Sequence, residues 1–514
     1  MTAQALQPPV LPPEAKTWLW LEDNARALGI HVTGSKGSGK SRLLGRRIAF
    51  FDAYRHVPTL ILDPSGEVSR NLIDRILSME RAVQDDMLAR IRYIDVGNPA
   101  WTATMPLYYR LGNEPLNTVA SRYLNVIRRL DVHLQTASVY GWNRVQRVGR
   151  ALGIIAAALG LQITEIELLL THPDVFRDRI DEALAGNPQE LTLPVRYYRS
   201  VLLAFDLDDR LKEADAFLGK VSLITWDPVM SAMFGADSAS IDWQALHDQE
   251  LIYLIDFSHL EGDDEKRFVL TWLFRSFVAA VRHMGKNRLR PISVIVDELT
   301  YLLSDASIEA DLLTNDLIEL IDVLSRNFKL WLTLAHQEMY QLNERVSGSV
   351  MTLGTQILGR STNLDSAKLL AERFYPTDFY KIKKTEPHYM GDGGGGYFKT
   401  HDTTVEFTAD EQLETHARRF MTLPTFTFMV GAAVREGAPA TTLQRGSIAR
   451  LDAGQFVNAP LVDQVLAALL QRHMVPVGGV RAGIAQRQDI QGAGLDRTTP
   501  PAKTPSRTRR RGES

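Results

Sequence analysis

Short apolar runs recur along the chain and predict the strands of a central sheet. Val, Ile and Leu fill both alternating positions in most of these runs, which is typical of strands buried between helices in a largely parallel sheet. Segments with helical spacing separate the runs, so the expected fold class is α/β. The predicted strands are Ile30–Thr33, Thr59–Leu62, Tyr93–Val96, Leu251–Ile255, Ile292–Val296, Leu330–Leu334, Gln356–Leu358 and Thr425–Val430.

The alternation stops between about residues 113 and 223, where apolar residues recur only at helical spacing. We therefore expect an all-helical domain inserted into the α/β domain. The apolar positions that predict its first helices are Val119, Tyr123, Val126, Ile127, Leu130, Val145, Val148, Leu152, Ile155 and Leu159.

Composition shifts mark the remaining borders of the predicted organisation. The start of the chain is rich in Pro and Gln, and its end is rich in Gly, Arg and Pro, which favours disorder at both ends. A glycine run at 391–396 predicts a flexible hairpin or loop. The expected segments are a disordered N-terminus (1–17), the first part of the α/β domain (18–112), the helical insertion (113–223), the second part of the α/β domain (224–440), a helical extension (441–474) and a disordered basic tail (475–514).

Composition narrows the classes of protein and of site. The 514 residues include no cysteine, which excludes disulfides, zinc fingers, iron–sulfur clusters and thiol catalysis. No apolar run approaches the ~20 residues of a membrane span, and no signal peptide is recognisable, so we expect a cytoplasmic protein without direct membrane insertion. With 58 Lys+Arg and 61 Asp+Glu the net charge is −3, so any nucleic-acid binding requires local basic patches. The predicted tail is one such patch.

One glycine-rich motif carries the candidate chemistry. Residues 34–41 read GSKGSGKS and satisfy the pattern G-x-x-x-x-G-K-[ST]. Glycines let consecutive backbone N–H groups surround phosphates, the lysine brings a charge to the β and γ oxygens, and the serine hydroxyl is a ligand for Mg²⁺. A strand precedes the motif and an amphipathic helix follows it, which disfavours a chance Gly/Ser turn. The expected ligands are ATP and Mg²⁺, and the expected binding residues are Gly34, Ser35, Lys36, Gly37, Ser38, Gly39, Lys40 and Ser41.

A second core strand should supply a carboxylate to the same site. The predicted strand Ile292–Val296 ends in Asp297 and Glu298. In such a pair the first acid holds Mg²⁺ through water, and the second can orient and deprotonate the attacking water. Two acids at a strand end are common in themselves. Together with the phosphate loop they indicate an ATPase, because a phosphate-loop kinase usually lacks a base aimed at water.

Three further polar positions have a functional and a structural interpretation. Gln337 follows an apolar strand, where a γ-phosphate sensor would lie, although a strand-end amide also caps turns. Arg326 ends a helical pattern, where most arginines are simply solvated. The segment Asp63–Glu67, with the sequence DPSGE, is most simply a tight turn, and contact with the nucleotide is the alternative.

Taken together, these residues resemble the HerA–FtsK superfamily of hexameric, RecA-like motor ATPases, and within it the TraG/TraD-type conjugative DNA-transfer coupling proteins. The likeness runs from about residue 18 to residue 434. It is carried by GSKGSGKS, LILDPSGE, the helical insertion, VIVDE, SRNFKLWLTLAHQ and ILGRSTNLDSAKLLAERF. The phosphate loop and the acid pair are generic, whereas the DPSGE turn and the spacing of Arg326 and Gln337 are specific. Coupling proteins of this type usually carry N-terminal transmembrane helices, and here 33 residues precede the loop.

The resemblance implies a RecA-like P-loop fold with a mainly parallel central sheet and an inserted all-helical domain. It implies that Lys40 and Ser41 contact the phosphates and Mg²⁺, and that Asp297 is a second Mg²⁺ ligand. Glu298 would be the catalytic base and Gln337 the sensor of the γ-phosphate. These roles are those of an ATP phosphohydrolase.

The resemblance also implies a homo-oligomeric ring, most simply a hexamer. Arg326 would reach the nucleotide of the neighbouring subunit as an arginine finger, with Arg360 as a second candidate. The leading hypothesis is an ATP-driven DNA translocase, with a relaxase, nuclease or secretion channel as a further partner. The alternatives are a secretion or assembly ATPase with protein cargo and a nucleotide-gated regulatory subunit. Basic residues on the insertion are either DNA contacts or solvated side chains: Arg122, Arg128, Arg129, Arg144 and Arg147.

Overall fold

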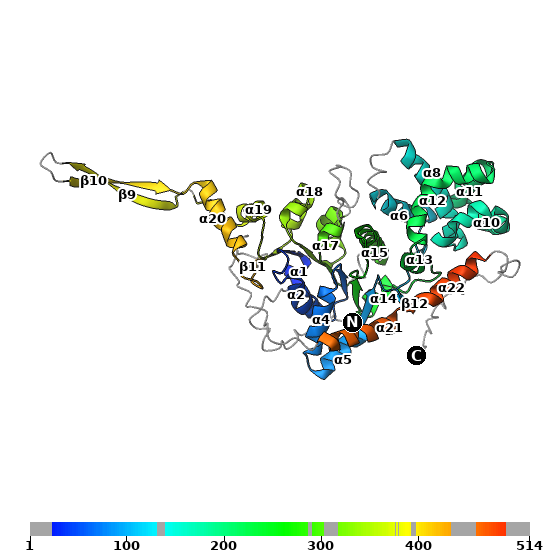
Figure 1. Ribbon diagram of the computed structural model, residues 1–514, viewed down its shortest axis with the longest axis horizontal. Coiled ribbons are helices and arrows are strands. Elements are labelled where there is room, and N and C mark those ends of the chain that lie inside the picture. The colour runs from blue at the N-terminus through cyan, green and yellow to red at the C-terminus, as the bar shows by residue number, and fades with distance from the viewer. Residues whose placement is uncertain are drawn as a thin grey trace, which may run out of the picture. The chain divides into compact units, whose positions relative to one another are not determined.

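The computed structural model describes residues 23–110, 112–130, 139–285, 290–302, 317–375, 377–378, 380–391, 397–432 and 459–489. These residues form two compact units, one built on a sheet and the other built of helices (Figure 1). The helical unit takes its described residues from 104–124, 137–239 and 475–489. The predicted disordered N-terminus lies outside the described residues.

The first unit contains an eight-stranded sheet in which only the edge strand β11 is antiparallel to its neighbour. Every residue of the six central strands is buried, as expected where helices cover both faces. The order is β11 (Met429–Ala432), β8 (Thr355–Leu358), β1 (Ile30–Thr33), β7 (Leu330–His336), β6 (Ile292–Val296), β2 (Thr59–Asp63), β5 (Ile252–Asp256) and β3 (Ile91–Asp95).

Each of these eight strands corresponds to a predicted apolar run. The last prediction is partly wrong, because Thr425–Phe428 forms a turn and the strand begins only at Met429. The expected fold class is confirmed: a mainly parallel α/β sheet carries the glycine-rich loop, and an all-helical part interrupts its sequence.

The strand order determines which loops can meet. Strand β7 lies between β1 and β6, and all three run in the same direction. Thr33 at the end of β1 pairs with His336 of β7, and Val296 at the end of β6 pairs with Leu334. Because parallel strands end at the same edge of a sheet, the segments that follow β1, β6 and β7 converge there.

Helices of the first unit surround this sheet, and a two-stranded hairpin follows α19. The hairpin strands are β9 (Ile382–Gly391) and β10 (Tyr397–Glu406), and every side chain of β9 is exposed. The helices are α1 (Asp23–Ala27), α2 (Lys40–Leu43), η2 (Leu44–Ala49), α3 (Phe50–Tyr54), α4 (Glu67–Leu77), α5 (Arg81–Arg90), α14 (Trp243–Asp248), α15 (Asp263–Met284), η6 (Leu299–Leu302), η7 (Leu320–Leu324), α17 (Ser325–Asn327), η8 (Met339–Gln341), α18 (Glu344–Met351), α19 (Leu364–Phe374), α20 (Ala409–Met421) and α21 (Ala459–His473).

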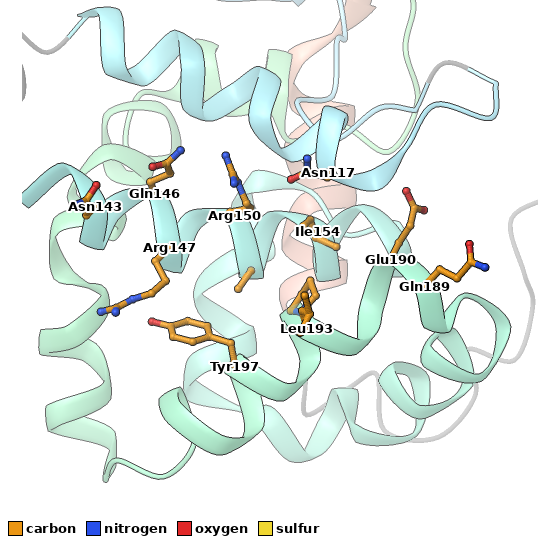
Figure 2. Close-up of a pocket in the computed structure, with 12 residues that line it drawn as sticks. Asn117, Asn143, Gln146, Arg147, Arg150, Ile154, Gln189, Glu190, Leu193 and Tyr197 are labelled. Carbon is orange, nitrogen blue, oxygen red and sulfur yellow. The ribbon is translucent and has the colours of Figure 1, made fainter.

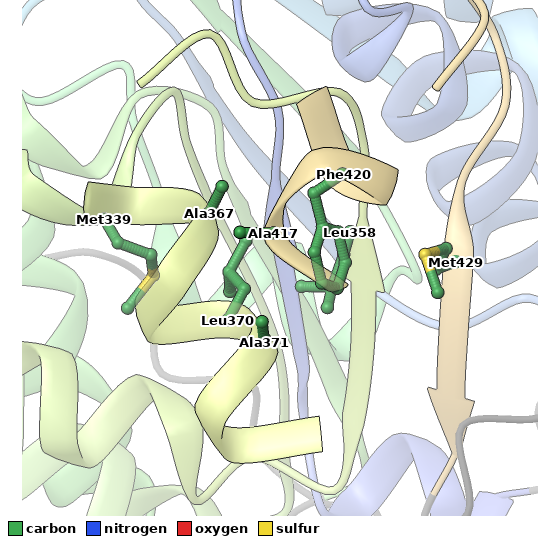
Figure 3. Close-up of a cluster of buried hydrophobic side chains, with 8 residues drawn as sticks. All are labelled: Met339, Leu358, Ala367, Leu370, Ala371, Ala417, Phe420 and Met429. Carbon is green, nitrogen blue, oxygen red and sulfur yellow. The ribbon is translucent and has the colours of Figure 1, made fainter. Parts of the chain in front are cut away.

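Two of these helices, α19 and α20, cover the β8–β11 edge of the sheet. Their apolar side chains meet those of both strands in one buried cluster (Figure 3). The cluster fixes the chain on both sides of the turn at 422–428, since it contains residues of α20 before the turn and of β11 after it. Its members are Met339, Leu358, Ala367, Leu370, Ala371, Ala417, Phe420 and Met429.

The helical unit contains most of the predicted insertion. The predicted border at residue 223 falls inside α12 and is wrong, because this unit continues to Ala239. Helix α6 (Leu116–Leu130) begins in this unit. Its other helices are α8 (Val139–Leu159), η3 (Ile163–Glu165), α9 (Ile166–Thr171), η4 (Pro173–Phe176), α10 (Arg177–Gly186), α11 (Pro188–Tyr197), η5 (Tyr198–Leu202), α12 (Leu207–Thr225), α13 (Pro228–Phe234) and α22 (Val477–Gln488).

Helix α22 corrects the prediction that the chain is disordered from residue 475. Its glycines disfavour a helix in isolation. Burial of Val477 and Ile484 offsets that cost, and Arg487 donates to Glu165 at 2.6 Å within the same unit. One of the tail's basic residues is therefore used internally. The predicted tail beyond residue 489 lies outside the described residues.

Among the described residues, no single helix has both the length and the apolar character that a membrane span requires. The segments Trp142–Leu159 and Ile163–Thr171 reach that threshold only as a pair, and they are bent by 112° at the break between them.

Two buried histidines link three neighbouring strands of the sheet, β8, β1 and β7. Nε2 of His31 in β1 lies 2.7 Å from Nε2 of His336 in β7, and Nδ1 of His31 faces the amide oxygen of Gln356 in β8. Burial lowers the pKa of His31 to about 4 and holds the pKa of His336 well below its ordinary value. Both rings are therefore neutral at neutral pH.

This pair predicts a loss of stability in acid. Between pH 6.5 and pH 4 the unfolded chain binds a proton at His31 that the folded chain does not bind, so the free energy of unfolding falls as the pH falls. The contribution of His31 is fully present above pH 6.5 and amounts to about 3 kcal/mol. Urea unfolding at pH 7.5 and pH 4.5 should show that His31→Gln weakens this dependence. The same change at exposed His56 serves as the control, and equal pH dependence in wild type and His31→Gln would contradict the prediction.

Candidate functional site

The glycine-rich loop follows β1 and leads directly into α2. Gly37 and Gly39 have φ angles of 80° and 101°, which an L side chain rarely adopts, and the helix begins at Lys40. The hydroxyls of Ser35 and Ser38 are buried and have no hydrogen-bond partner in the part of the chain that the structure describes. Buried donors without partners beside the positive end of a helix suit an anion such as phosphate.

The loop meets the acid pair that follows β6. The Ser41 hydroxyl donates to Oδ2 of Asp297 at 2.9 Å, although 256 positions separate the two residues. The Lys40 ammonium lies 3.8 Å from Oδ1 of Asp297 and 3.8 Å from Oε2 of Glu298. Oδ1 of Asp297 is buried without a hydrogen-bond partner among the described residues. A hydroxyl beside a carboxylate with a free oxygen is a donor set that fits Mg²⁺, which prefers oxygen ligands and retains several waters.

Glu298 is held by two side chains from opposite sides of its carboxylate. The Gln337 amide donates to Oε2 at 2.8 Å, and the Thr300 hydroxyl donates to Oε1 at 2.9 Å. The backbone of Glu298 has a φ of 63°, a left-handed conformation that is rare outside glycine and clusters at functional sites. The structure therefore brings Lys40, Glu298 and Gln337, three predicted site residues, to the same place.

Asp63 ends β2 at the same edge of the sheet. Its carboxylate accepts hydrogen bonds from the N–H groups of Ser65 and Ser69 and from the Ser65 hydroxyl, so it stabilises the turn into α4. Burial, followed by the charges of Asp297 and Asp256, raises the pKa of Asp63 to about 7. These contacts favour the turn interpretation of the DPSGE segment.

The two candidate arginines lie at opposite ends of the parallel strands: Arg360 follows the end of β8, and Arg326 precedes the start of β7. The Arg360 carbonyl accepts from the Ser35 N–H at 2.7 Å, so Arg360 is beside the phosphate loop of its own chain. Arg326 is exposed on α17, before the first residue of β7, whereas Gln337 follows the last. The seven residues of β7 span roughly 20 Å. Arg326 is therefore remote from the site of its own chain.

Two residues at this edge were missed by the sequence analysis. Thr300 orients Glu298, and buried Glu338 accepts from the Ser361 hydroxyl at 2.7 Å and from the Thr362 N–H at 2.8 Å. Glu338 thereby joins the segment after β7 to the segment after β8. The available signal for Glu338 was its position directly after Gln337 at the end of an apolar strand. Its partners Ser361 and Thr362 could not be foreseen, because they are distant in sequence.

The arginines of the insertion are largely engaged within the helical unit. Arg122 is buried and paired with Glu114, while Arg144 and Arg147 both contact Glu213. These three contacts favour a structural role over a free basic patch.

A pocket of about 700 Å³ opens in the helical unit (Figure 2). The guanidinium of Arg147 lies 5.6 Å from the centre of the Tyr197 ring, and Arg150 is exposed on the same helix. The lining thus combines guanidinium and amide donors with apolar side chains. It consists of Asn117, Asn143, Gln146, Arg147, Arg150, Ala151, Ile154, Gln189, Glu190, Leu193, Pro194 and Tyr197.

Comparisons with known proteins return structural neighbours only. No model of a known protein family and no curated protein matches the chain. The bacterial conjugative coupling protein TrwBΔN70 in its unbound form is similar at 15% identity and a TM-score of 0.48, over 82% of this chain and 88% of that chain. The plasmid coupling protein TrwB in complex with ADP and Mg²⁺ is similar at 14% identity and a TM-score of 0.46, over 85% and 88%.

VirB4 of Thermoanaerobacter pseudethanolicus is similar at 13% identity and a TM-score of 0.44, over 80% of this chain and 90% of that chain.

Proposed function

We propose that this chain is an ATP-hydrolysing motor of the kind that serves conjugation and type IV secretion, acting on DNA in the cytoplasm. One observation carries the ATPase part of the proposal. The phosphate loop meets the acid pair, with Ser41 bonded to Asp297 at 2.9 Å and Lys40 placed 3.8 Å from both acids. The neighbour TrwB, solved with ADP and Mg²⁺, makes ATP and Mg²⁺ the ligands to test first.

The proposed chemistry assigns a separate task to each side chain. The backbone N–H groups of Gly37 and Gly39 and the Lys40 ammonium would bind the phosphates, and Ser41 and Asp297 would hold Mg²⁺. When bound, Mg²⁺ would neutralise charge on the β- and γ-phosphate oxygens. Glu298 would accept a proton from the attacking water as the water oxygen bonds to the γ-phosphorus, while the bond from that phosphorus to the β,γ-bridging oxygen breaks and ADP leaves. Gln337, already bonded to Glu298, would hold that carboxylate and contact the γ-phosphate.

Two substitutions should separate binding from turnover. Lys40→Ala removes a contact with ground-state phosphates, so we expect weak nucleotide binding and no hydrolysis. Glu298→Gln removes only the base, so we expect ATP binding close to wild type with a loss of at least about 100-fold in kcat. Nucleotide binding and phosphate release measured on the same preparations test both changes. Normal turnover by Glu298→Gln would show that another group is the base.

The effect of DNA on the rate of ATP hydrolysis distinguishes a DNA motor from an ATPase with protein cargo. A motor coupled to DNA should hydrolyse ATP several-fold faster when single- or double-stranded DNA is present, and the effect should weaken as salt rises. Phosphate release with each form of DNA measures this, and Glu298→Gln is the control for contaminating ATPases. An unchanged rate with both forms would favour a secretion or assembly ATPase with protein cargo. Stimulation without displacement of a blocking protein from DNA would favour a regulatory subunit.

The position of Arg326 supports a role in trans. At the opposite end of β7 from Gln337, its guanidinium cannot serve the nucleotide of the same chain, but in a ring it could face the open site of the next subunit. A homo-hexamer is the simplest such ring. Arg360 lies beside its own loop and is better suited to a contact in cis.

Mixing of inactive subunits tests this assignment. Arg326→Ala should bind ATP yet lose about 10³-fold or more in kcat, as expected for an arginine finger. Rings that combine Lys40→Ala with Arg326→Ala subunits should recover activity where an intact loop meets an intact Arg326. Co-assembly is verified by pull-down of differently tagged subunits. Co-assembled rings without recovered activity would contradict a role in trans.

A further inference from the structure

The turn between α20 and β11 contains an aromatic residue in an unfavourable backbone conformation. Phe426 has a φ of 63°, in the left-handed region that a bulky side chain rarely occupies. The sequence predicts a strand here, and Thr427 N–H instead closes the turn by donating to the Pro424 carbonyl at 3.1 Å. The cluster of Figure 3 holds both flanks, through Phe420 before the turn and Met429 after it. The surrounding structure therefore imposes this conformation on Phe426.

The turn is fastened to the phosphate loop. The Phe426 N–H donates to the Ser38 carbonyl at 2.8 Å. A Cβ on Gly39 would lie 2.2 Å from Cδ1 of the Phe426 ring, so the ring rests directly against the backbone of Gly39. Two features require glycine at position 39. Its φ is 101°, which side-chain-bearing residues rarely adopt, and the Phe426 ring leaves no space for a side chain. The strained turn thus brings an aromatic ring to the loop that is built for phosphates.

The ring is supported on one side and remains partly exposed. The guanidinium of buried Arg42, the residue after Ser41, lies over the ring at 5.2 Å from its centre. Phe426 itself is only half-buried. A planar apolar surface is therefore available within a few residues of the phosphate-binding groups. A nucleotide has the matching form, with a flat base attached to its phosphates through a sugar.

We propose that Phe426 is the stacking surface for the base of the nucleotide whose phosphates occupy residues 34–41. This inference rests on the proposed ATPase function and adds a determinant of nucleotide binding outside the phosphate loop. Base–aromatic stacking uses the π-face common to all bases. Phe426 therefore strengthens binding of nucleotides relative to inorganic phosphates, and it does so without reading the edge of the base. The alternative role of the ring is to support the loop by covering Gly39.

Two ligands separate these roles, because ADP carries a base and pyrophosphate does not. The variant Phe426→Gly removes the ring, keeps the N–H that donates to Ser38 and favours the left-handed backbone. We expect it to bind ADP roughly ten- to a hundredfold more weakly in the presence of Mg²⁺ and to bind pyrophosphate as wild type does. Phe426→Tyr keeps the ring and should retain ADP affinity. Tyr380→Ala, which removes a ring that is 86% exposed, is the control for loss of an aromatic side chain.

Calorimetric titration of the full chain with each ligand gives the result. A selective loss of ADP affinity in Phe426→Gly supports the proposal. An equal loss for ADP and pyrophosphate would overturn it in favour of loop support, and unchanged ADP affinity would overturn it outright. Failure of the proposed ATPase function has a different signature, since wild type would then bind neither ligand. Thermal unfolding of each variant excludes loss of the fold as the cause.

Discussion

The hydrogen bond from Ser41 to Asp297 is the interaction on which the site depends. It joins the first helical turn after β1 to the residue after β6, across a sheet in which β7 lies between them. The bond forms only if the three strands are parallel and in their observed register, because a shift of one residue would turn each strand-end side chain to the other face.

Further contacts join the glycine-rich loop and the neighbouring loops to one another. Gln337 bonds to Glu298, the Arg360 carbonyl accepts from Ser35, and the Phe426 N–H donates to Ser38. Glu338 joins the loop after β7 to the loop after β8. A displacement of the phosphate loop would therefore alter the positions of the acid pair, the β8 loop and the β11 turn together. Such linkage is what a motor requires if events at the γ-phosphate are to move distant surfaces.

Elements of the fold could be predicted from sequence where the local pattern of apolar and polar residues reports their burial. Buried strands such as Ile292–Val296 were predicted with their observed bounds because apolar runs report burial on both faces. The glycine run at 391–396 predicted a hairpin or loop, but the strands β9 and β10 on either side of it were missed because β9 is exposed on both faces and neither strand shows apolar alternation. Helix α22 was missed because its glycines favour disorder locally, and burial of Val477 and Ile484 becomes visible only in the folded unit.

The same distinction applies to the site. The glycine-rich loop and the acid pair could be predicted to form a site because each is a contiguous motif whose residue types suit phosphate and Mg²⁺ chemistry. Thr300 and Glu338 were missed because their importance lies in contacts with other segments. Phe426 lay in a predicted strand, and its left-handed backbone goes with contacts distant in sequence: the cluster that holds both flanks of the turn, and a loop almost 400 positions earlier.

The central claim is that the loop of 34–41 and the acid pair form one Mg²⁺–nucleotide site. Calorimetric titration of ADP into the wild-type chain, with Mg²⁺ and with EDTA, tests this claim most directly. We expect one nucleotide per chain and markedly weaker binding in EDTA, because Ser41 and Asp297 would then hold no cation between them and the phosphates. Absence of ADP binding, or binding that is indifferent to Mg²⁺, would contradict the account.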